Sequence, residues 1–315
     1  MEQIRQASVL GRMPEHSFYE TATHYLKTKK KDSLAQDAMN LKILAPYLKD
    51  LNISEIRDHH LDIYREDRRL EGVKNRTINS PLETLRHLLN LAEKKWVDKN
   101  DLHWLAKAPT IEMLPLDDAR PPYPLSFQEE KELINQCEGP LKLIVPFASN
   151  TGTRKSEVLG LRWEWEIRVP ELNISVFVIP KNMVKNREPR LVVLNDKANE
   201  IIESVRGEHP EFVFTHEGMP IESLRSIGWN EARENAKLPH IRFHDLKHTY
   251  GRRLFKAGVS IEIRRYLLGH KVKKDSVTNH YSEPDLETLL EHSNKVCHMK
   301  INDSPTYASL LQRAS

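Results

Sequence analysis

A proline-rich stretch after the first third of the chain most limits how these 315 residues can fold. Five of the nineteen residues in the segment AKAPTIEMLPLDDARPPYP, positions 106–124, are proline. Because proline lacks a backbone donor and disfavours helix at the residue before it, the segment predicts an extended connector. The sequence therefore indicates two domains with residues 106–124 as the linker, which also suits a chain of this length.

The part before the linker, residues 15–105, carries apolar side chains three or four positions apart, the spacing of amphipathic helices. The alternation of apolar and polar residues that is typical of strands is absent. The sequence therefore predicts a small all-helical domain. Its expected helices cover 17–28 and 35–51, then begin near Ser54 and near Thr77.

The part after the linker mixes helices with a little β-structure. Ser126 and Glu129 have the spacing of a capping box ahead of an apolar helical segment. Two runs rich in β-branched residues, 173–179 and 190–194, flank a charged turn and predict a hairpin or small sheet. The expected fold class is mainly α with a small antiparallel β-sheet (α+β), the second domain covering residues 125–286.

Both ends of the chain are expected to lie outside these domains, as an N-terminal tail over 1–14 and a C-terminal tail over 287–315. Leu289 and Leu290 give the C-terminal tail an apolar side. This side predicts either a contact with a neighbouring protomer or a return of the tail onto its own domain.

Composition excludes several classes of protein. No apolar run approaches the roughly 20 residues that span a bilayer, and the first residues lack the apolar block of a secretory signal. We therefore expect a cytoplasmic protein without a membrane partner. Two cysteines, Cys137 and Cys297, are too few for a disulfide framework or a four-thiolate zinc site, so they predict small buried or half-buried side chains. A net charge of +3 is only a weak sign of a polyanionic partner.

Four separated clusters in the second domain hold residues suited to phosphoester chemistry. In the first, Gly152 predicts a turn before a helix, where Arg154 can face an anion and Glu157 can orient it. The second is the charged turn with Lys181, Lys185 and Arg187, where a desolvated lysine could give a proton to a leaving oxygen.

The third cluster places His244, Lys247 and His248 on one helical face, while Leu246, Tyr250 and Leu254 form another face that enters the core. In the fourth, Gly269 ends a helix and fixes the position of His270, with Tyr281 eleven residues beyond that histidine. Taken singly, each cluster is also what a surface ion pair, a charged turn or a partly packed tyrosine would give.

Together and in this order, the clusters resemble the catalytic domain of the tyrosine recombinase (phage integrase) family over residues 125–285. The helical first domain also suits the core-binding, DNA-binding domain that precedes it in that family, and too little chain precedes it for a separate arm-site domain. The family's motifs fall on Thr151, Gly152, Arg154 and Glu157 (T-G-x-R-x-x-E), Lys185 (hairpin lysine), His244 to Lys247 (H-x-x-R), His270 (L-G-H) and Tyr281 (nucleophile, in HYSEP).

The resemblance implies a site-specific recombinase that cuts and rejoins DNA through a 3′-phosphotyrosyl intermediate at Tyr281. Arg154 and Lys247 would stabilise the non-bridging phosphate oxygens, and Lys185 would act as general acid. His244 would accept the tyrosine proton or hold a non-bridging oxygen, and His270 would donate to the phosphate. The implied partner is double-stranded DNA with specific recombination sites, bound by a homotetramer. Neither a metal nor another cofactor is expected.

One position departs from the family pattern, since Lys247 stands where an arginine is usual. Lysine keeps the positive charge but loses the planar two-pronged contact to phosphate. This predicts weakened catalysis, compensation by Arg187 or Arg252, or a relative that binds DNA without cutting it.

Two other enzyme classes share part of the pattern. His244 and His248 have the spacing of a zinc peptidase motif, but its second residue is Asp245, one methylene shorter than the expected glutamate, and nothing marks a third ligand. A type IB topoisomerase shares the chemistry, but the small helical first domain and the L-G-H spacing resemble integrases better.

Overall fold

The computed structural model describes residues 15–184, 187–270 and 283–299, so the predicted N-terminal tail over 1–14 lies outside the described residues. The chain divides into two compact units on either side of the Pro121–Pro122 bond. Both are mainly helical, and the second adds small antiparallel sheets, which confirms the predicted fold class. None of the described helices is long and apolar enough to cross a membrane.

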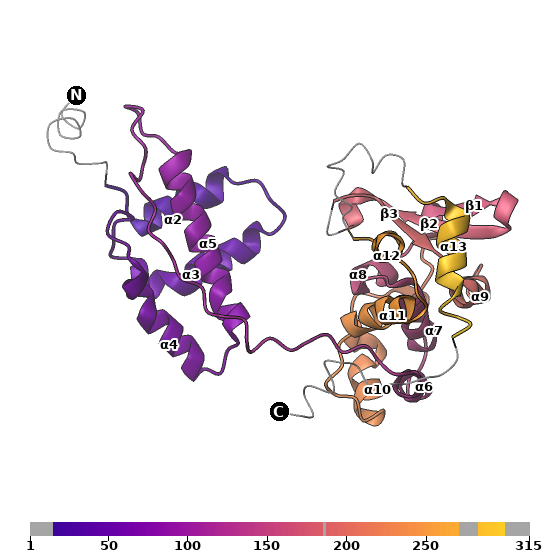
Figure 1. The fold of residues 1–315 in the computed structure, drawn as a ribbon. Helices are drawn as coiled ribbons and strands as arrows, with labels where there is room; N and C mark the ends of the chain where they lie inside the picture. Colours follow the sequence, from indigo (N-terminus) through magenta and orange to yellow (C-terminus); the bar gives the residue numbers. More distant parts are fainter. Residues whose placement is uncertain (1–14, 185–186, 271–282, 300–315) are drawn as a thin grey trace. The chain divides into compact units, whose positions relative to one another are not determined.

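The first unit is a bundle of helices around one apolar core (Figure 1). Side chains spaced three or four apart on each helix meet there, and Tyr25, Leu44 and Leu82 are fully buried. Burying each such side chain contributes about 1.5–3 kcal/mol. The helices of this unit are α2 (Phe18–Thr28), α3 (Leu34–Leu48), α4 (Asp62–Leu70) and α5 (Asn75–Lys94), with a short 3-10 helix η1 (Asp58–Leu61) before α4.

The expected start of the third helix near Ser54 is wrong. The Glu55 carboxylate instead accepts a hydrogen bond from the Asn52 amide at 2.8 Å, which forms a turn. Ile53 and Ile56 are both fully buried from this turn, so its apolar residues fill the core without a helix. The helix begins only at η1, and Ile63 on α4 is 68% exposed.

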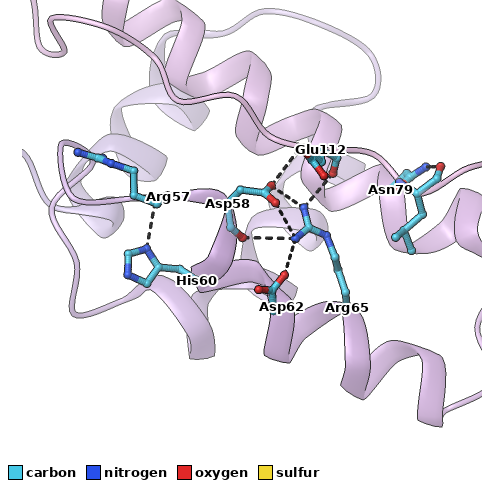
Figure 2. A network of polar contacts seen from close by, with 8 residues as sticks. Arg57, Asp58, His60, Asp62, Arg65, Asn79 and Glu112 are labelled. Carbon is cyan, nitrogen blue, oxygen red and sulfur yellow. Dashed lines mark hydrogen bonds and ion pairs between the residues drawn. The ribbon is translucent and has the colours of Figure 1, made fainter.

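Residues 111–118, which we call the strap, belong to the predicted linker but lie against the first unit. The Arg65 guanidinium, 7% exposed, donates to the Glu112 carbonyl at 2.9 Å and to the Asp58 carboxylate at 2.6 Å (Figure 2). The Glu112 amide in turn donates to Asp58 at 2.9 Å. Burial disfavours the charge of Asp58, but these bonds hold its pKa below the usual value. The backbone of Glu112 thus attaches the strap to the ion pair between Arg65 and Asp58 of the bundle.

A second clasp lies further along the strap. The Asn79 side chain donates to the Leu114 carbonyl and accepts from the Leu114 amide, both at 2.8 Å. Both bonds join side chain to backbone, so one asparagine satisfies both backbone polar groups of Leu114. Asp118 then accepts from the Asn75 amide at 2.6 Å at the start of α5.

The second unit is built around α7 (Leu141–Thr151), which packs between α9 (Asp196–Ser204) and α11 (His244–Lys256) (Figure 1). Every residue of α7 from Ile144 onward is buried. The helix α6 (Phe127–Asn135) begins with the predicted capping box: the Ser126 hydroxyl accepts from the Glu129 amide at 3.1 Å, and the Glu129 carboxylate accepts from the Ser126 amide at 2.8 Å.

The sheet of the second unit has three antiparallel strands in the order β1-β2-β3. The sequence predicted the second and third strands and missed the first, because its residues EIRV have only two apolar members and Ile167 is 51% exposed. A two-stranded ladder lies elsewhere in the unit. The strands are β1 (Glu166–Val169), β2 (Ile174–Ile179), β3 (Arg190–Val193), β4 (Thr215–His216) and β5 (Met219–Pro220).

The C-terminal helix α13 (Leu286–Asn294) packs on its own unit, beside β3 and α12 (Ile261–Leu267). Leu289 is 4% exposed, and the Ser293 hydroxyl lies 2.7 Å from the buried Tyr250 hydroxyl. The sequence left open whether the C-terminal tail contacts a neighbouring protomer or packs on its own domain. In the described part of the tail, residues 287–299, the chain packs on its own domain. The remaining helices are α8 (Lys155–Leu159), α10 (Trp229–Asn235) and the 3-10 helices η2 (Trp163–Trp165), η3 (Pro170–Leu172), η4 (Lys181–Met183) and η5 (Arg225–Ile227).

Replacing Asn79 by alanine tests the clasp. We expect Asn79→Ala to lower the free energy of unfolding of the first unit by about 1–3 kcal/mol, because it leaves the backbone N–H and C=O of Leu114 without their partner. Asn90→Ala, on the same helix, removes only a bond to the Arg86 carbonyl at the surface and should change stability by about 0.5 kcal/mol or less. Urea unfolding of both variants measures the difference, and equal losses would contradict the clasp.

Candidate active site

The first predicted cluster forms a tight turn between two helices. Gly152 ends α7 with φ +62°, a left-handed conformation that favours glycine, and a Cβ there would lie 2.8 Å from the Tyr250 ring. The chain then extends to Arg154, which caps α8. The turn therefore sets Arg154 at the first turn of a helix that starts directly after it, with its side chain 18% exposed.

Glu157 holds Arg154 in this position. Its carboxylate accepts from the Arg154 amide at 2.7 Å and from the Arg154 guanidinium at 2.7 Å. The carboxylate is almost fully buried, and the oxygen that accepts from the Arg154 amide also accepts from Arg190. Burial works against the charge of Glu157, but Arg190 and the bonds from Arg154 keep its pKa below the usual range. One carboxylate thus orients two arginines.

Arg190 is a residue of the site that the sequence did not single out. It opens β3, is 3% exposed, and bonds the Glu157 carboxylate that also holds Arg154. Its second terminal nitrogen donates to the carbonyls of Thr151 at 3.2 Å and Gly152 at 2.9 Å. The available signal was an arginine at the head of an otherwise apolar strand, RLVV. Such a residue, once buried, needs a partner of opposite charge.

Lys247 lies inside the same cluster. It projects from α11, is 4% exposed, and donates from its amine to the Leu268 carbonyl. Burial lowers the pKa of Lys247 to about 6, and the nearby charges of Arg190 and Arg154 contribute in the same direction. In the free protein at neutral pH the amine is therefore mostly uncharged.

The neighbours of Lys247 on α11 divide as predicted. Leu246, Tyr250 and Leu254 are buried in the core. His244 stands at the exposed start of the helix, and its ring centre lies 4.8 Å from that of His248. Partial burial, followed by His248, Lys247 and Arg154, lowers the pKa of His244. No set of three metal-ligating side chains occurs in the described part of the chain, so the zinc hypothesis gains no third ligand.

His270 reaches the cluster from a different segment. The helix α12 ends at Leu267, Gly269 takes φ +59°, and the His270 amide donates to the Arg265 carbonyl at 2.9 Å. Partial burial lowers the pKa of His270, and so do the charges of Lys247, Arg154 and Arg190 in that order. These electrostatic contacts bring His270 together with residues more than twenty and more than a hundred positions earlier.

Two predicted residues, Lys185 and Tyr281, lie outside the described residues. Lys181 of the same hairpin turn is exposed on η4. The charges of Arg190 and Arg154 act on Lys247. Compensation for the lysine by Arg187 or Arg252 stays a prediction.

The described site thus combines a fixed, partly exposed guanidinium, two imidazoles at the surface and a buried amine. Arg154, Arg190 and Glu157 together carry one net positive charge, and Lys247 can add a second when it is protonated. Fixed donors around a water-poor position stabilise an anion far better than donors in water. The arrangement can therefore bind a group such as a phosphate diester.

Comparison with known proteins places the site in a family. A family model described as the phage integrase family matches residues 124–287. The integrase of Salmonella phage P22 is 28% identical over 228 residues, which make up 68% of this chain and 56% of that protein. The chain thus matches little more than half of this relative's length.

Two solved structures share the fold. The integrase of transposon Tn1549, in complex with transposon right end DNA, superposes with a TM-score of 0.61 and 17% identity over 87% of this chain and 97% of that one. A lambda integrase tetramer bound to a Holliday junction superposes with a TM-score of 0.60 and 14% identity over 88% and 83%. At these identities the likeness concerns the fold.

The buried amine of Lys247 makes stability depend on pH. Its pKa falls from 10.5 to about 6 on folding, so unfolding takes up a proton between these values and the free energy of unfolding rises with pH. From about pH 6 to about pH 9 the rise from this group amounts to as much as about 4 kcal/mol, at about 1.4 kcal/mol per pH unit. Urea unfolding across this range should show a shallower slope for Lys247→Met than for the wild type.

Lys256→Met is the matched control, since Lys256 is an exposed lysine of the same helix. Its slope should equal that of the wild type. A Lys247→Met protein with the wild-type slope would mean that the amine is not buried as described.

Proposed function

The chain belongs to the phage integrase family, and from that premise we propose that it is a site-specific DNA recombinase with Tyr281 as its nucleophile. The observation that carries the proposal is the meeting of Arg154, Lys247 and His270, from three separate segments, in one cluster suited to an anion. The tyrosine oxygen attacks a DNA phosphodiester, which forms a 3′-phosphotyrosyl bond and releases a 5′-hydroxyl. The 5′-hydroxyl of a second DNA then reverses the step.

The cations of the cluster act on the phosphate oxygens. Charge builds up on the non-bridging oxygens in the transition state, and Arg154, fixed by Glu157, is aimed at such a charge. An approaching phosphate also favours the protonated amine, so DNA binding draws a proton onto Lys247. Loss of one such donor costs about 3–4 kcal/mol, or roughly a hundred- to a thousand-fold in rate.

In this proposal His244 accepts a proton and His270 donates a hydrogen bond. Tyrosine has a pKa of about 10, so the phenol is a weak nucleophile at neutral pH unless a base takes its proton. The lowered pKa of His244 keeps that imidazole neutral and able to accept a proton. A neutral His270 can donate its remaining N–H to a phosphate oxygen. Lys185, in the hairpin turn, is our candidate for the acid that protonates the leaving 5′-oxygen.

The chemistry needs no energy source beyond the DNA itself. Each step exchanges one phosphoester bond for another, so ATP is not consumed. The charge stabilisation that metal ions supply in many phosphoryl transfers is assigned here to Arg154 and Lys247. We therefore propose catalysis without a metal or other cofactor.

The proposed partner is double-stranded DNA carrying specific recombination sites, and the proposed working assembly is a homotetramer on DNA. The fold shared with a lambda integrase tetramer bound to a Holliday junction supports this assembly. A cytoplasmic location follows from the proposed substrate. Which bases are read stays open, because phosphate contacts carry no sequence information.

A nicked suicide substrate tests the nucleophile. DNA that loses a short fragment after cleavage cannot be rejoined, so the wild-type protein should accumulate as a covalent adduct that resists denaturation. Tyr281→Phe should form none, because it lacks the attacking oxygen. Tyr19→Phe, which alters a tyrosine that is 73% exposed in the first unit, should form as much adduct as the wild type.

The same assay separates the alternatives. Binding to DNA without any adduct from the wild type would favour a relative that grips DNA without cutting it. Adduct formation should also continue in excess EDTA. Its complete loss in the chelator, with recovery on adding zinc, would contradict the metal-free assignment.

A further inference from the structure

Arg190 is a buried cation that the proposed reaction does not use directly. Its side chain is 2% exposed, so it cannot reach a bound DNA strand. A lone buried charge is costly, and proteins retain one only where a partner and hydrogen bonds compensate it. Its contacts therefore indicate what Arg190 does.

The guanidinium joins β3 to the turn that carries Arg154. One terminal nitrogen bonds the Glu157 carboxylate, which in turn holds Arg154. The other donates to the Thr151 and Gly152 carbonyls at 3.2 and 2.9 Å. The guanidinium thus reaches two carbonyls and a carboxylate through separate nitrogens, which the fork of an arginine can do and the single nitrogen of a lysine amine cannot.

The rest of the side chain lies against the turn that carries His270. A Cβ on Gly269 would stand 2.6 Å from Nε of Arg190 and 2.8 Å from its Cδ, so only a glycine fits there. The residue before it, Leu268, accepts from the Lys247 amine and packs against the first turn, since a Cβ on Gly152 would lie 3.1 Å from its Cδ2. The turn at Gly152 and the turn at Gly269 therefore both contact the Arg190 side chain.

We propose that Arg190 is a positioning residue, which fixes Arg154 and His270 relative to each other so that both can engage one phosphate. The inference rests on the proposed function for its catalytic consequence. Its structural content, that one guanidinium clamps two turns more than a hundred residues apart, stands on the contacts alone.

The charge of Arg190 adds an electrostatic effect. It faces Glu157, Arg154 and Lys247, and it contributes to the lowered pKa of both Lys247 and His270. Without that charge, repulsion on the Lys247 amine weakens and the amine holds its proton to higher pH. A positioning role therefore comes with a signature in the pH profile that loss of stability alone would not produce.

Arg253 provides a matched control. It is a second buried arginine of the same unit, 5% exposed, and pairs with Glu130 at 2.6 Å and lies over the Phe127 ring, away from both turns of the site in the sequence. Arg190→Gln and Arg253→Gln each remove a buried cation from a carboxylate partner. Differences between the two variants at matched fractions of folded protein therefore report on the clamp.

The experiment compares single-turnover cleavage of the nicked substrate by the full-length wild type, Arg190→Gln, Arg190→Lys and Arg253→Gln. We expect the rate constant of Arg190→Gln to fall about a hundred-fold, with DNA affinity within about three-fold of the wild type. Arg190→Lys should lie between them, and Arg253→Gln should stay within about three-fold. The basic limb of the rate profile should move to higher pH in Arg190→Gln but not in Arg253→Gln.

Amide hydrogen exchange in the free protein gives a readout that needs no activity. In Arg190→Gln the Gly152 and His270 amides should both exchange at least about ten times faster, and in Arg253→Gln neither should change. Unchanged exchange in Arg190→Gln, or equal effects of both variants on rate and exchange, would overturn the proposal. A wild-type protein that forms no adduct counts against the proposed function alone, and the exchange data then decide the role of Arg190.

Discussion

The arrangement of the site in the second unit depends on the ion pairs that the buried Glu157 carboxylate makes with Arg154 and Arg190. It neutralises Arg190, which would otherwise be an uncompensated charge in the core, and it orients Arg154, which is partly exposed. Removing one partner of a buried ion pair typically costs about 3–5 kcal/mol, far more than a surface pair. The same buried carboxylate that stabilises the unit therefore also holds the partly exposed guanidinium of Arg154 in a position where it can bind an anion.

The lysine at position 247 takes its properties from the same network. Burial lowers the pKa of Lys247 to about 6, and the net positive charge of two arginines that share one carboxylate adds to the effect. An arginine in this place would stay charged at any physiological pH. With lysine, the amine can gain or lose its proton near neutral pH, which a guanidinium in the family's usual position does not do.

In the first unit, too, a buried arginine paired with a carboxylate holds another segment of the chain in place, here the strap. A buried arginine, Arg65, again bonds a carboxylate and a backbone carbonyl, here to fix an extended segment and not a site. Residues 106–124 contain no helix or strand, as the prolines indicated, because prolines act on the local backbone. They did not indicate that residues 111–118 adhere to the bundle, since that depends on Arg65 and Asn79, which lie 35 or more positions earlier.

Features that depend on local chemistry could be predicted from the sequence. These are the helical spacing before the linker, the capping box at Ser126, the glycine turns and the order of the motifs that carry Arg154, His244, Lys247 and His270. The fold was needed to show that Arg190 joins two of these motifs, that the amine of Lys247 is buried, and that α13 packs on its own unit. The physical reason is that burial and charge pairing between distant segments depend on which surfaces meet, and periodicity within a segment carries no record of that.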